Sequence, residues 1–351
     1  MTVSRVSDLV LREFLAAALQ ALGLSRADAT TVAGAMAFAD RRGIASHGLA
    51  LLPYYAGLIE RGVNPLGRPV ISRDQGSVLV IDGGNSLGHV AADFAVAAAI
   101  DRAASTGVGV AAIGGSSHCG AMSAYATRAL ERGMIGFATT NAMPTMAPSG
   151  GMSRIVGMNP LAVAIPAGEE EAFVLDASLA AAARGKIVVR AQEGEALPPG
   201  WALDVKGRPT TDPAAALAGL LVPIGGPKGV GLAMVMGILS SLLSGAAYGT
   251  ELGSLESGPE PGRDGHFMMV LDIAAFTDRD AFGNRMDSVI RQIRACPPAD
   301  GAQVRVPGDR AREAEEAAIK GGIPIPDSTL ANADALAERL GLDPVIREVA
   351  A

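Results

Sequence analysis

The alternation of β-type and helical segments between residues 77 and 139 constrains the fold of this chain more than any other feature. The sequence predicts strands at 77–81, 108–113 and 134–139, separated by an alanine-rich helix at about 90–105 and a second helix at 121–131. Strands and helices that alternate in this way are typical of an α/β domain. We therefore expect an α/β fold for the central part of the chain.

The two ends of the chain favour helices instead. Apolar residues recur at helical spacing over residues 8–22, and Ser25 followed by Asp28 is an N-cap signal for a second helix. At 351 residues the chain is long enough for two domains, each with its own core. We expect a helical domain built from residues 1–73 and 297–351, and an α/β domain built from residues 74–296.

Charge and cysteine usage exclude several classes of partner. The chain has 29 basic and 36 acidic residues, a net charge of -7, and no basic run interleaved with aromatic residues, so nucleic acid is not expected to bind. Cys119 and Cys296 are too few for a disulfide framework or a cysteine-rich metal site, which favours a cytoplasmic protein without a bound metal.

Residues 229–249 carry no charge over a length that could span a bilayer. The segment contains five glycines and three serines, and the chain has no second segment of this kind. We interpret it as a buried helix and expect no membrane association.

Two of the four histidines lie in similar settings beside serine and glycine. They are found in Ser46-His47-Gly48 and in the run Ser117-His118-Cys119-Gly120. Histidine can exchange protons near neutral pH, so the pair is a candidate for acid/base catalysis. Ordinary loop or core histidines bonded to the backbone would give the same pattern, and the sequence leaves both interpretations open.

Neither of the usual glycine-rich phosphate signatures is present, since no GxGxxG joins a strand to a helix and no GxxxxGK[ST] occurs. Residues 225–229, which include Lys228, could instead bind an anion at a helix N-terminus, or they could be a glycine-rich turn with a solvated lysine. Residues 114–120 also lead from a strand into a helix, so they too could bind an anion at a helix N-terminus or form an ordinary glycine-rich turn. Asp176 ends an expected strand, where it could orient a histidine or cap the next helix.

Taken together, the short motifs of this chain resemble those of the malate/L-lactate dehydrogenase family that is unrelated to the Rossmann-fold enzymes. This family includes ureidoglycolate and sulfolactate dehydrogenases, diketogulonate reductase and Δ1-piperideine-2-carboxylate reductases. The motifs that carry the resemblance run in family order over nearly the whole chain: Ser46-His47-Gly48, Pro53-Tyr54-Tyr55, Gly62-Val63-Asn64-Pro65, Ser117-His118-Cys119-Gly120, Gly150-Gly151, Asn159-Pro160-Leu161-Ala162, Asp176-Ala177-Ser178, Gly185-Lys186, Pro209-Thr210-Thr211-Asp212-Pro213, Gly226-Pro227-Lys228-Gly229 and Pro307-Gly308-Asp309-Arg310.

The resemblance implies a fold and an activity. The fold would be a non-Rossmann nicotinamide-binding domain with a mixed sheet, joined to a helical domain from both termini, in a homodimer. The activity would be NAD- or NADP-dependent hydride transfer at C2 of a small 2-hydroxy or 2-oxo acid. Two alternatives stay open: a reductase of a cyclic imino acid such as Δ1-piperideine-2-carboxylate, and a nucleotide-binding protein without catalysis.

The resemblance also implies roles for individual residues. In the reductase branch the histidine matching His47 donates the proton and residues matching Ser46 and Asp176 form a relay. In the ureidoglycolate branch the histidine matching His118 acts as the acid/base. The residues that match cofactor contacts are Ser117, His118, Cys119, Gly120, Asp176, Ala177, Ser178, Lys228, Gly229, Pro307, Gly308, Asp309 and Arg310.

One departure from the family bears on the substrate. Many members have an arginine four residues after the first histidine, where it binds the substrate carboxylate, and this chain has Leu51 there. The carboxylate therefore needs another cation, for which we consider Arg42, Arg154 and Arg184.

Overall fold

A seven-stranded mixed sheet forms the centre of the computed structural model, which describes residues 2–255 and 257–345. Its strand order is β2-β3-β4-β15-β5-β8-β9, and only β3 and β4 run parallel. The strands are β2 Val70–Gln75, β3 Val78–Asp82, β4 Val108–Ser116, β15 Asp264–Asp272, β5 Met134–Thr140, β8 Leu161–Ile165 and β9 Phe173–Ala177. The predicted α/β class with a mixed sheet is thus confirmed.

Several helices follow the strands of this sheet in the chain. Helix α4, Gly88–Thr106, packs against β4 and β15 through a face rich in alanine, which lets helix and sheet approach closely. The segment after β4 forms α5, Ser123–Ala126, and a 3-10 turn, Thr127–Arg132, where the sequence predicted one helix. Helix α9, Arg279–Arg294, follows the N-cap Asp278, whose side chain accepts a hydrogen bond from the Ala281 N–H.

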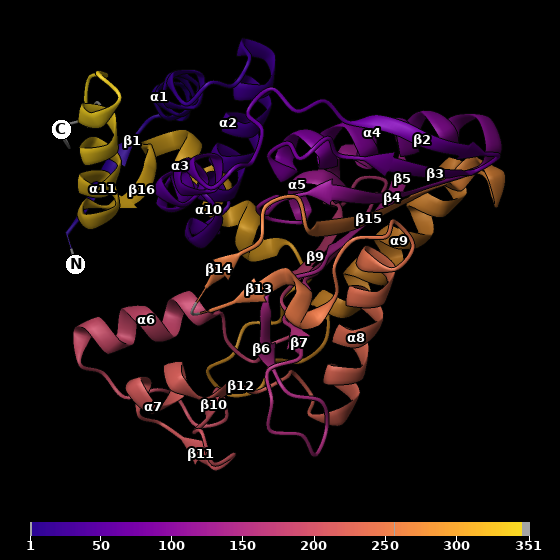
Figure 1. Cartoon of the computed structure of the whole chain (residues 1–351). Coiled ribbons are helices and arrows are strands. Elements are labelled where there is room, and N and C mark those ends of the chain that lie inside the picture. Colours follow the sequence, from indigo (N-terminus) through magenta and orange to yellow (C-terminus); the bar gives the residue numbers. More distant parts are fainter. Residues whose placement is uncertain (1, 256, 346–351) are drawn as a thin grey trace.

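The two ends of the chain share one hydrophobic core, so residues far apart in sequence lie side by side at one end of the molecule (Figure 1). The first helices are α1 Asp8–Ala21, α2 Arg26–Arg41 and α3 Leu52–Glu60, and the last are α10 Asp309–Gly321 and α11 Asp327–Arg339. Strand β1, Val3–Val6, pairs with β16, Ile323–Pro326, and ties the two ends together.

Local signals in the sequence explain where these helices begin and end. The hydroxyls of Ser7 and Ser25 accept hydrogen bonds from backbone N–H groups of the first helical turn, as N-caps do. Gly43 has a φ of 74° just after α2, a conformation that glycine adopts without steric cost. The chain therefore leaves α2 in a sharp turn that leads directly into Ser46 and His47.

A third hydrophobic cluster builds a separate lobe below the sheet in Figure 1. Its elements are β6 Pro144–Met146, β7 Val156–Gly157, α6 Arg184–Glu193, β10 Ala202–Leu203, β11 Pro209–Thr210, α7 Pro213–Ala218 and β12 Leu220–Leu221. We propose that this lobe belongs to the 74–296 domain.

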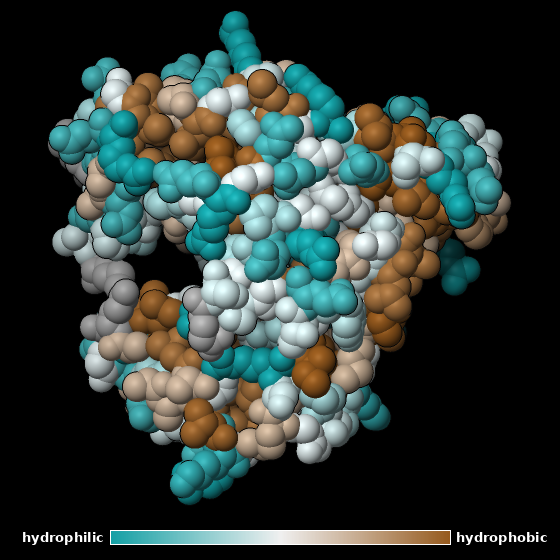
Figure 2. Space-filling view, in the orientation of Figure 1, coloured by the Kyte–Doolittle hydropathy of each residue, from teal (hydrophilic) through white to brown (hydrophobic). Residues whose placement is uncertain are grey.

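Two further short strands, β13 Gly253–Ser254 and β14 Gly258–Pro259, form a hairpin before β15. Space-filling atoms leave a hollow between the helical end of the molecule and the lobe that carries α6 (Figure 2). Elements from opposite parts of the chain therefore face each other across an opening.

Helix α8, Pro227–Ser241, contains most of the uncharged segment, and only one of its faces is buried. Val230, Ala233 and Met236 pack into the third cluster. The opposite face leaves large apolar side chains exposed at Leu232, Val235 and Ile238, and Leu242 and Leu243, just after the helix, are exposed too. The expectation of a buried helix was therefore only half correct. Among residues 2–255 and 257–345, no helix combines the length and apolar character that a membrane crossing requires.

Candidate active site

All four histidines of the chain gather where the helices from the two ends of the chain meet the sheet. The rings of His47 and His118 are stacked, and Tyr55 connects His118 to His89. His266 lies next to Cys119, the residue that follows His118. The two histidines singled out from the sequence thus lie together, although 70 residues separate them.

His47 lies on a short 3-10 turn, Ala45–His47, between α2 and α3. The Ser46 hydroxyl lies 2.9 Å from Nδ1 of His47. The carboxyl of Asp40, on α2, holds the end of this turn because it accepts a 2.7 Å hydrogen bond from the Leu49 N–H. A side chain at Gly48 would lie 2.0 Å from this carboxyl group, so the glycine of the Ser-His-Gly motif is required by close packing.

His118 lies in the loop that follows β4, and its Nδ1 atom has two partners. The Tyr55 hydroxyl lies 2.9 Å from it, and the Gly120 N–H donates to it at 3.3 Å. The Nε2 atoms of His47 and His118 have no hydrogen bond in the described part of the chain, and neither atom is fully buried. Both Nε2 atoms are therefore available to a small molecule.

Burial sets the protonation of both histidines. It lowers the pKa of His47, against the opposing effect of the Asp176 charge. It lowers the pKa of His118 well below the ordinary value, and the neighbouring histidines lower it further. Both rings are therefore neutral at pH 7, the state in which histidine can accept a proton.

Asp176 lies on β9, and Ser123 holds its carboxylate. Both the backbone N–H and the hydroxyl of Ser123 donate to Oδ2 of Asp176. The relay implied by the family would link Asp176 to His47 through Ser46, whereas the hydrogen bonds of Asp176 in the described residues go to Ser123. Asp176 acts on His47 through its charge.

A cavity of about 750 Å³ opens beside Asp176, between α2, α10 and the edge strand β9. Its lining residues are Arg42, Gly43, Ile44, Ser123, Val174, Asp176, Gln303, Arg305, Val306, Pro307, Gly308, Arg310, Ala311 and Ala314. The volume suits a cofactor-sized ligand, and Arg305 and Arg310 together with the N-terminus of α10 suit its phosphates. The chemistry of this lining therefore fits a nicotinamide dinucleotide.

Some of the predicted cofactor residues line this cavity, and the others lie outside its lining. Pro307, Gly308, Asp176 and Arg310 line it. The carboxylate of Asp309 accepts from the Val306 N–H and thereby shapes the loop before α10.

Other predicted contacts have structural partners of their own. The Ser117 hydroxyl accepts from the Gly88 N–H at the start of α4. The Cys119 thiol is buried beside His266, and burial raises its pKa. Ala177 pairs with Leu161 in the sheet, and the Ser178 hydroxyl accepts from the Ala180 N–H.

Lys228 and Gly229 lie at the start of α8, outside the lining of this cavity. The Lys228 side chain is exposed. A side chain at Gly229 would overlap the carbonyl oxygen of Ile224, so this glycine allows close packing of the loop on the helix. No contact within the described chain joins either residue to the histidines.

Only one of the three candidate arginines lies near the histidines. Arg42 lines the cavity with Asp176, whose charge acts on it, and forms a 3.1 Å ion pair with Glu315. Arg154 donates to backbone carbonyls, including that of Gly219, and Arg184 lines a narrow pocket with Arg154 in the third cluster. Leu51, where the family's arginine was expected, packs against the helical core.

Three residues of this site were missed at the level of sequence. Tyr55 lies in the Pro53-Tyr54-Tyr55 motif, which does not indicate its contact with His118, and Ser123 and Asp40 lie in none of the family motifs. Tyr55 contacts His118 across 63 residues of chain, and Ser123 contacts Asp176 across 53. Asp40 contacts Leu49 across 9 residues. Within the described residues, no group of three or more His, Cys, Asp or Glu side chains could hold a metal ion.

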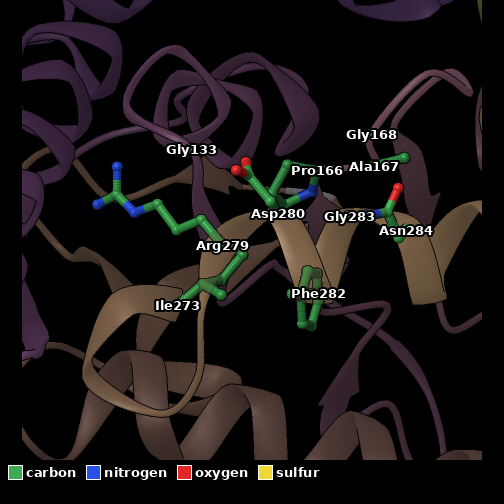
Figure 3. A pocket seen from close by; sticks show the side chains of 10 residues that line it. All are labelled: Gly133, Pro166, Ala167, Gly168, Ile273, Arg279, Asp280, Phe282, Gly283 and Asn284. Carbon is green, nitrogen blue, oxygen red and sulfur yellow. The ribbon is translucent and has the colours of Figure 1, made fainter.

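A second cavity of about 500 Å³ lies at the start of α9 and contains none of these residues (Figure 3). The side chains of Arg279, Asp280 and Phe282 leave the helix in different directions and do not converge. Arg279 forms a 2.7 Å ion pair with Asp272. This pocket offers no assembled set of reactive groups.

The mixed-sheet fold, the stacked histidines and the cavity beside Asp176 are those expected of an NAD(P)-dependent oxidoreductase outside the Rossmann class. Residues 6–333 match the family model described as malate/L-lactate dehydrogenase, and the chain belongs to this family. The family resemblance seen in the sequence is thereby confirmed.

Characterised relatives support this assignment over most of their length. The chain is 36% identical over 292 residues to the L-sulfolactate dehydrogenase of Methanocaldococcus jannaschii, which covers 83% of this chain and 84% of that protein. It is 38% identical over 310 residues to the (2R)-3-sulfolactate dehydrogenase (NADP(+)) of Chromohalobacter salexigens, covering 88% and 91%. It is 33% identical over 321 residues to the ureidoglycolate dehydrogenase (NAD(+)) of Escherichia coli O157:H7, covering 90% and 91%.

Solved structures agree with the fold. The sulfolactate dehydrogenase structure from Methanocaldococcus jannaschii superposes with a TM-score of 0.90 at 32% identity, covering 97% of this chain and 98% of that chain. The Δ1-piperideine-2-carboxylate reductase structure from Pseudomonas syringae pvar. tomato gives a TM-score of 0.84 at 29% identity, covering 95% and 99%. Dehydrogenase and imine-reductase relatives therefore share one fold.

Proposed function

We propose that His47 exchanges the proton of the C2 oxygen while the substrate gains or loses a hydride at C2. The observation that carries this proposal is the stacked pair of neutral histidines, whose Nε2 atoms are free, close to Asp176 and the cavity. When bound, NAD or NADP supplies or accepts the hydride.

The chain's own residues would manage the proton. In the direction of oxidation, neutral His47 accepts the hydroxyl proton at Nε2, and Ser46 holds the ring through Nδ1. The nearby charge of Asp176 favours the imidazolium that forms. In the direction of reduction, the same imidazolium returns the proton to the C2 oxygen.

We assign the substrate carboxylate to Arg42. Its guanidinium is near Asp176 and the histidine turn, and the other two arginines are held in the third cluster. A planar guanidinium binds a carboxylate through two parallel hydrogen bonds, which would fix C2 relative to His47. Arg42 would thus do the work for which the family commonly uses an arginine at the position of Leu51.

We place the cofactor along the cavity, in contact with Pro307, Gly308 and Arg310 and with Asp176 on β9. The loop residues 117–120 and 176–178 border the histidine site and remain proposed contacts of the cofactor. Lys228 and Gly229 remain proposed contacts on the strength of the family motif alone.

We further propose a cytoplasmic homodimer. The exposed apolar face of α8 is larger than isolated surface residues explain, and hydrophobic atoms follow the flank of the molecule that α8 occupies (Figure 2). A second copy of the chain would cover this face. Both cysteines are free thiols, in agreement with a reducing compartment.

A substrate panel tests the proposed activity. Purified protein is given NAD or NADP with malate, sulfolactate, lactate and ureidoglycolate, and NAD(P)H with Δ1-piperideine-2-carboxylate. We expect oxidation of at least one 2-hydroxy acid to exceed reduction of the imine. Turnover of the imine alone would favour the reductase, and cofactor binding with no turnover would favour a protein without catalysis.

A further inference from the structure

The hydrogen-bond partners of His118 determine which of its ring nitrogens carries the proton. A backbone N–H can only donate, so the bond from Gly120 requires an unprotonated Nδ1 on His118. A neutral imidazole carries one proton. In neutral His118 this proton must therefore be on Nε2.

The same reasoning determines the direction in which the Tyr55 hydroxyl donates its hydrogen bond. Burial raises the pKa of its hydroxyl well above the ordinary value, so the hydroxyl is protonated at neutral pH. Because Nδ1 of His118 accepts, the Tyr55 O–H donates to it across 2.9 Å. The oxygen of Tyr55 is then free to accept a hydrogen bond from its second partner, His89.

His89 completes the chain of hydrogen bonds. Its Nε2 lies 3.4 Å from the Tyr55 oxygen, and burial lowers its pKa to about 3, so the ring is neutral. Since the Tyr55 proton is directed at His118, Nε2 of His89 carries its own proton and donates it. Nδ1 of His89 is then a bare acceptor, and it is indeed a buried atom without a hydrogen-bond partner.

We propose that Tyr55 is a positioning residue that, supported by His89, fixes His118 as the Nε2–H tautomer, so that His118 presents a hydrogen-bond donor to the substrate oxygen. This step rests on the proposed function only where it names the substrate. His118 has no free lone pair with which to accept the hydroxyl proton, so proton exchange falls to His47. The two stacked histidines thereby have different tasks.

Transfer of the proton along the whole chain is disfavoured. If His118 gave up its Nε2 proton and took one from Tyr55, a tyrosinate would be left in a fully buried position. A buried anion without a cationic partner is costly. The chain from His89 through Tyr55 to His118 therefore holds a tautomer and does not conduct protons.

The experiment is nitrogen NMR of the free protein with its four histidines labelled with ¹⁵N in both ring positions. Long-range proton–nitrogen correlation separates protonated from unprotonated ring nitrogens, and a His118→Gln spectrum identifies the signals of His118. We expect Nε2 of His118 to be protonated and Nδ1 to be bare near pH 7.5. A wild-type spectrum with the proton on Nδ1 overturns the proposal, whatever the variants do.

Variants test the part played by the tyrosine. Tyr55→Phe should shift His118 toward a mixture of tautomers and lower kcat about tenfold, as loss of one orienting hydrogen bond would. Tyr54→Phe is the matched control, because its ring also packs on His118 while its hydroxyl bonds to no histidine, and it should leave the tautomer unchanged. If Tyr55→Phe leaves both the spectrum and kcat as in the wild type, Tyr55 has no positioning role.

His89→Leu removes the donor to Tyr55 and provides a second test if Tyr55→Phe folds poorly. We expect it to weaken the tautomer preference of His118 less than Tyr55→Phe does, and an unchanged preference would count against the role of His89. Since the spectrum is recorded without substrate, a protein that shows the expected tautomer but no dehydrogenase activity would disprove the proposed function alone.

Discussion

The imidazole rings of His47 and His118 lie nearly parallel, with centroids 5.8 Å apart and planes inclined by 17°. Two rings this close disfavour a charge on either one, and the pKa of His118 is lowered in part by His47. The pair therefore rests in its neutral form. A proton taken up by one ring is readily released, which suits a reversible reaction.

The carboxyl group of Asp40 gives the fold a specific pH dependence. Burial raises its pKa from 3.8 to about 7, against the hydrogen bond from Leu49. A carboxyl whose pKa is higher in the folded state stabilises the fold below the unfolded pKa and loses this contribution as the pH rises toward 7. The Asp40 contribution is therefore lost between pH 3.8 and about 7.

Asp40→Asn should remove this dependence. We expect the free energy of unfolding of the variant, relative to wild type, to rise by up to ~3 kcal/mol between about pH 5 and about pH 8, measured by urea denaturation. Histidine titration is common to both proteins and cancels in the difference. Parallel stability curves would contradict a raised pKa of the Asp40 carboxyl in the folded protein.

Arg42→Leu should raise KM for the 2-hydroxy acid about 10- to 100-fold, the effect of losing a hydrogen bond to a charged group. Arg41→Leu is the matched control, because Arg41 also pairs with Glu315, at 2.7 Å, but does not line the cavity. Steady-state kinetics with saturating cofactor separate the two variants. An equal rise of KM in both would show that Glu315, rather than the substrate, is the partner that matters.

Loss of the apolar face of α8 should separate the subunits. We expect the wild-type protein to sediment as a dimer and the double variant Val235→Glu, Leu242→Glu to sediment as a monomer, since two buried charges oppose association. Ile319→Glu on α10 places the same charge at an exposed apolar side chain elsewhere and should remain dimeric. A monomeric wild-type protein, or a double variant that stays dimeric, would rule out this interface.

Sequence patterns predicted the parts of this protein that depend on local signals. The Ser46-His47-Gly48 motif, the N-cap at Ser25 and the main strands follow from residues close together in the chain. The contact of His118 with Tyr55 depends on how the terminal helices pack against the sheet, and that of Asp176 with Ser123 depends on how α5 packs against β9. No local pattern records that arrangement.

Helix α8 shows a second limit of prediction from sequence patterns. It is apolar on all sides, and such a helix can lie in a core, in a membrane or at an interface between subunits. Periodicity cannot separate these cases, whereas burial in the folded chain does, since Val230 and Ala233 are covered and Val235 is not. The two-residue strands of the third lobe were missed for a related reason, because distant pairing defines them.

The most direct test of the central claim is the turnover of His47→Ala and His118→Ala with the best substrate of the panel. We expect His47→Ala to lower kcat by at least ~100-fold, as loss of an acid/base group does, while NAD(P)H binding measured by fluorescence stays unchanged. His118→Ala should lower kcat less, because it removes a hydrogen-bond donor. A His47→Ala enzyme with intact kcat, beside an inactive His118→Ala enzyme, would reverse the two roles and contradict the account.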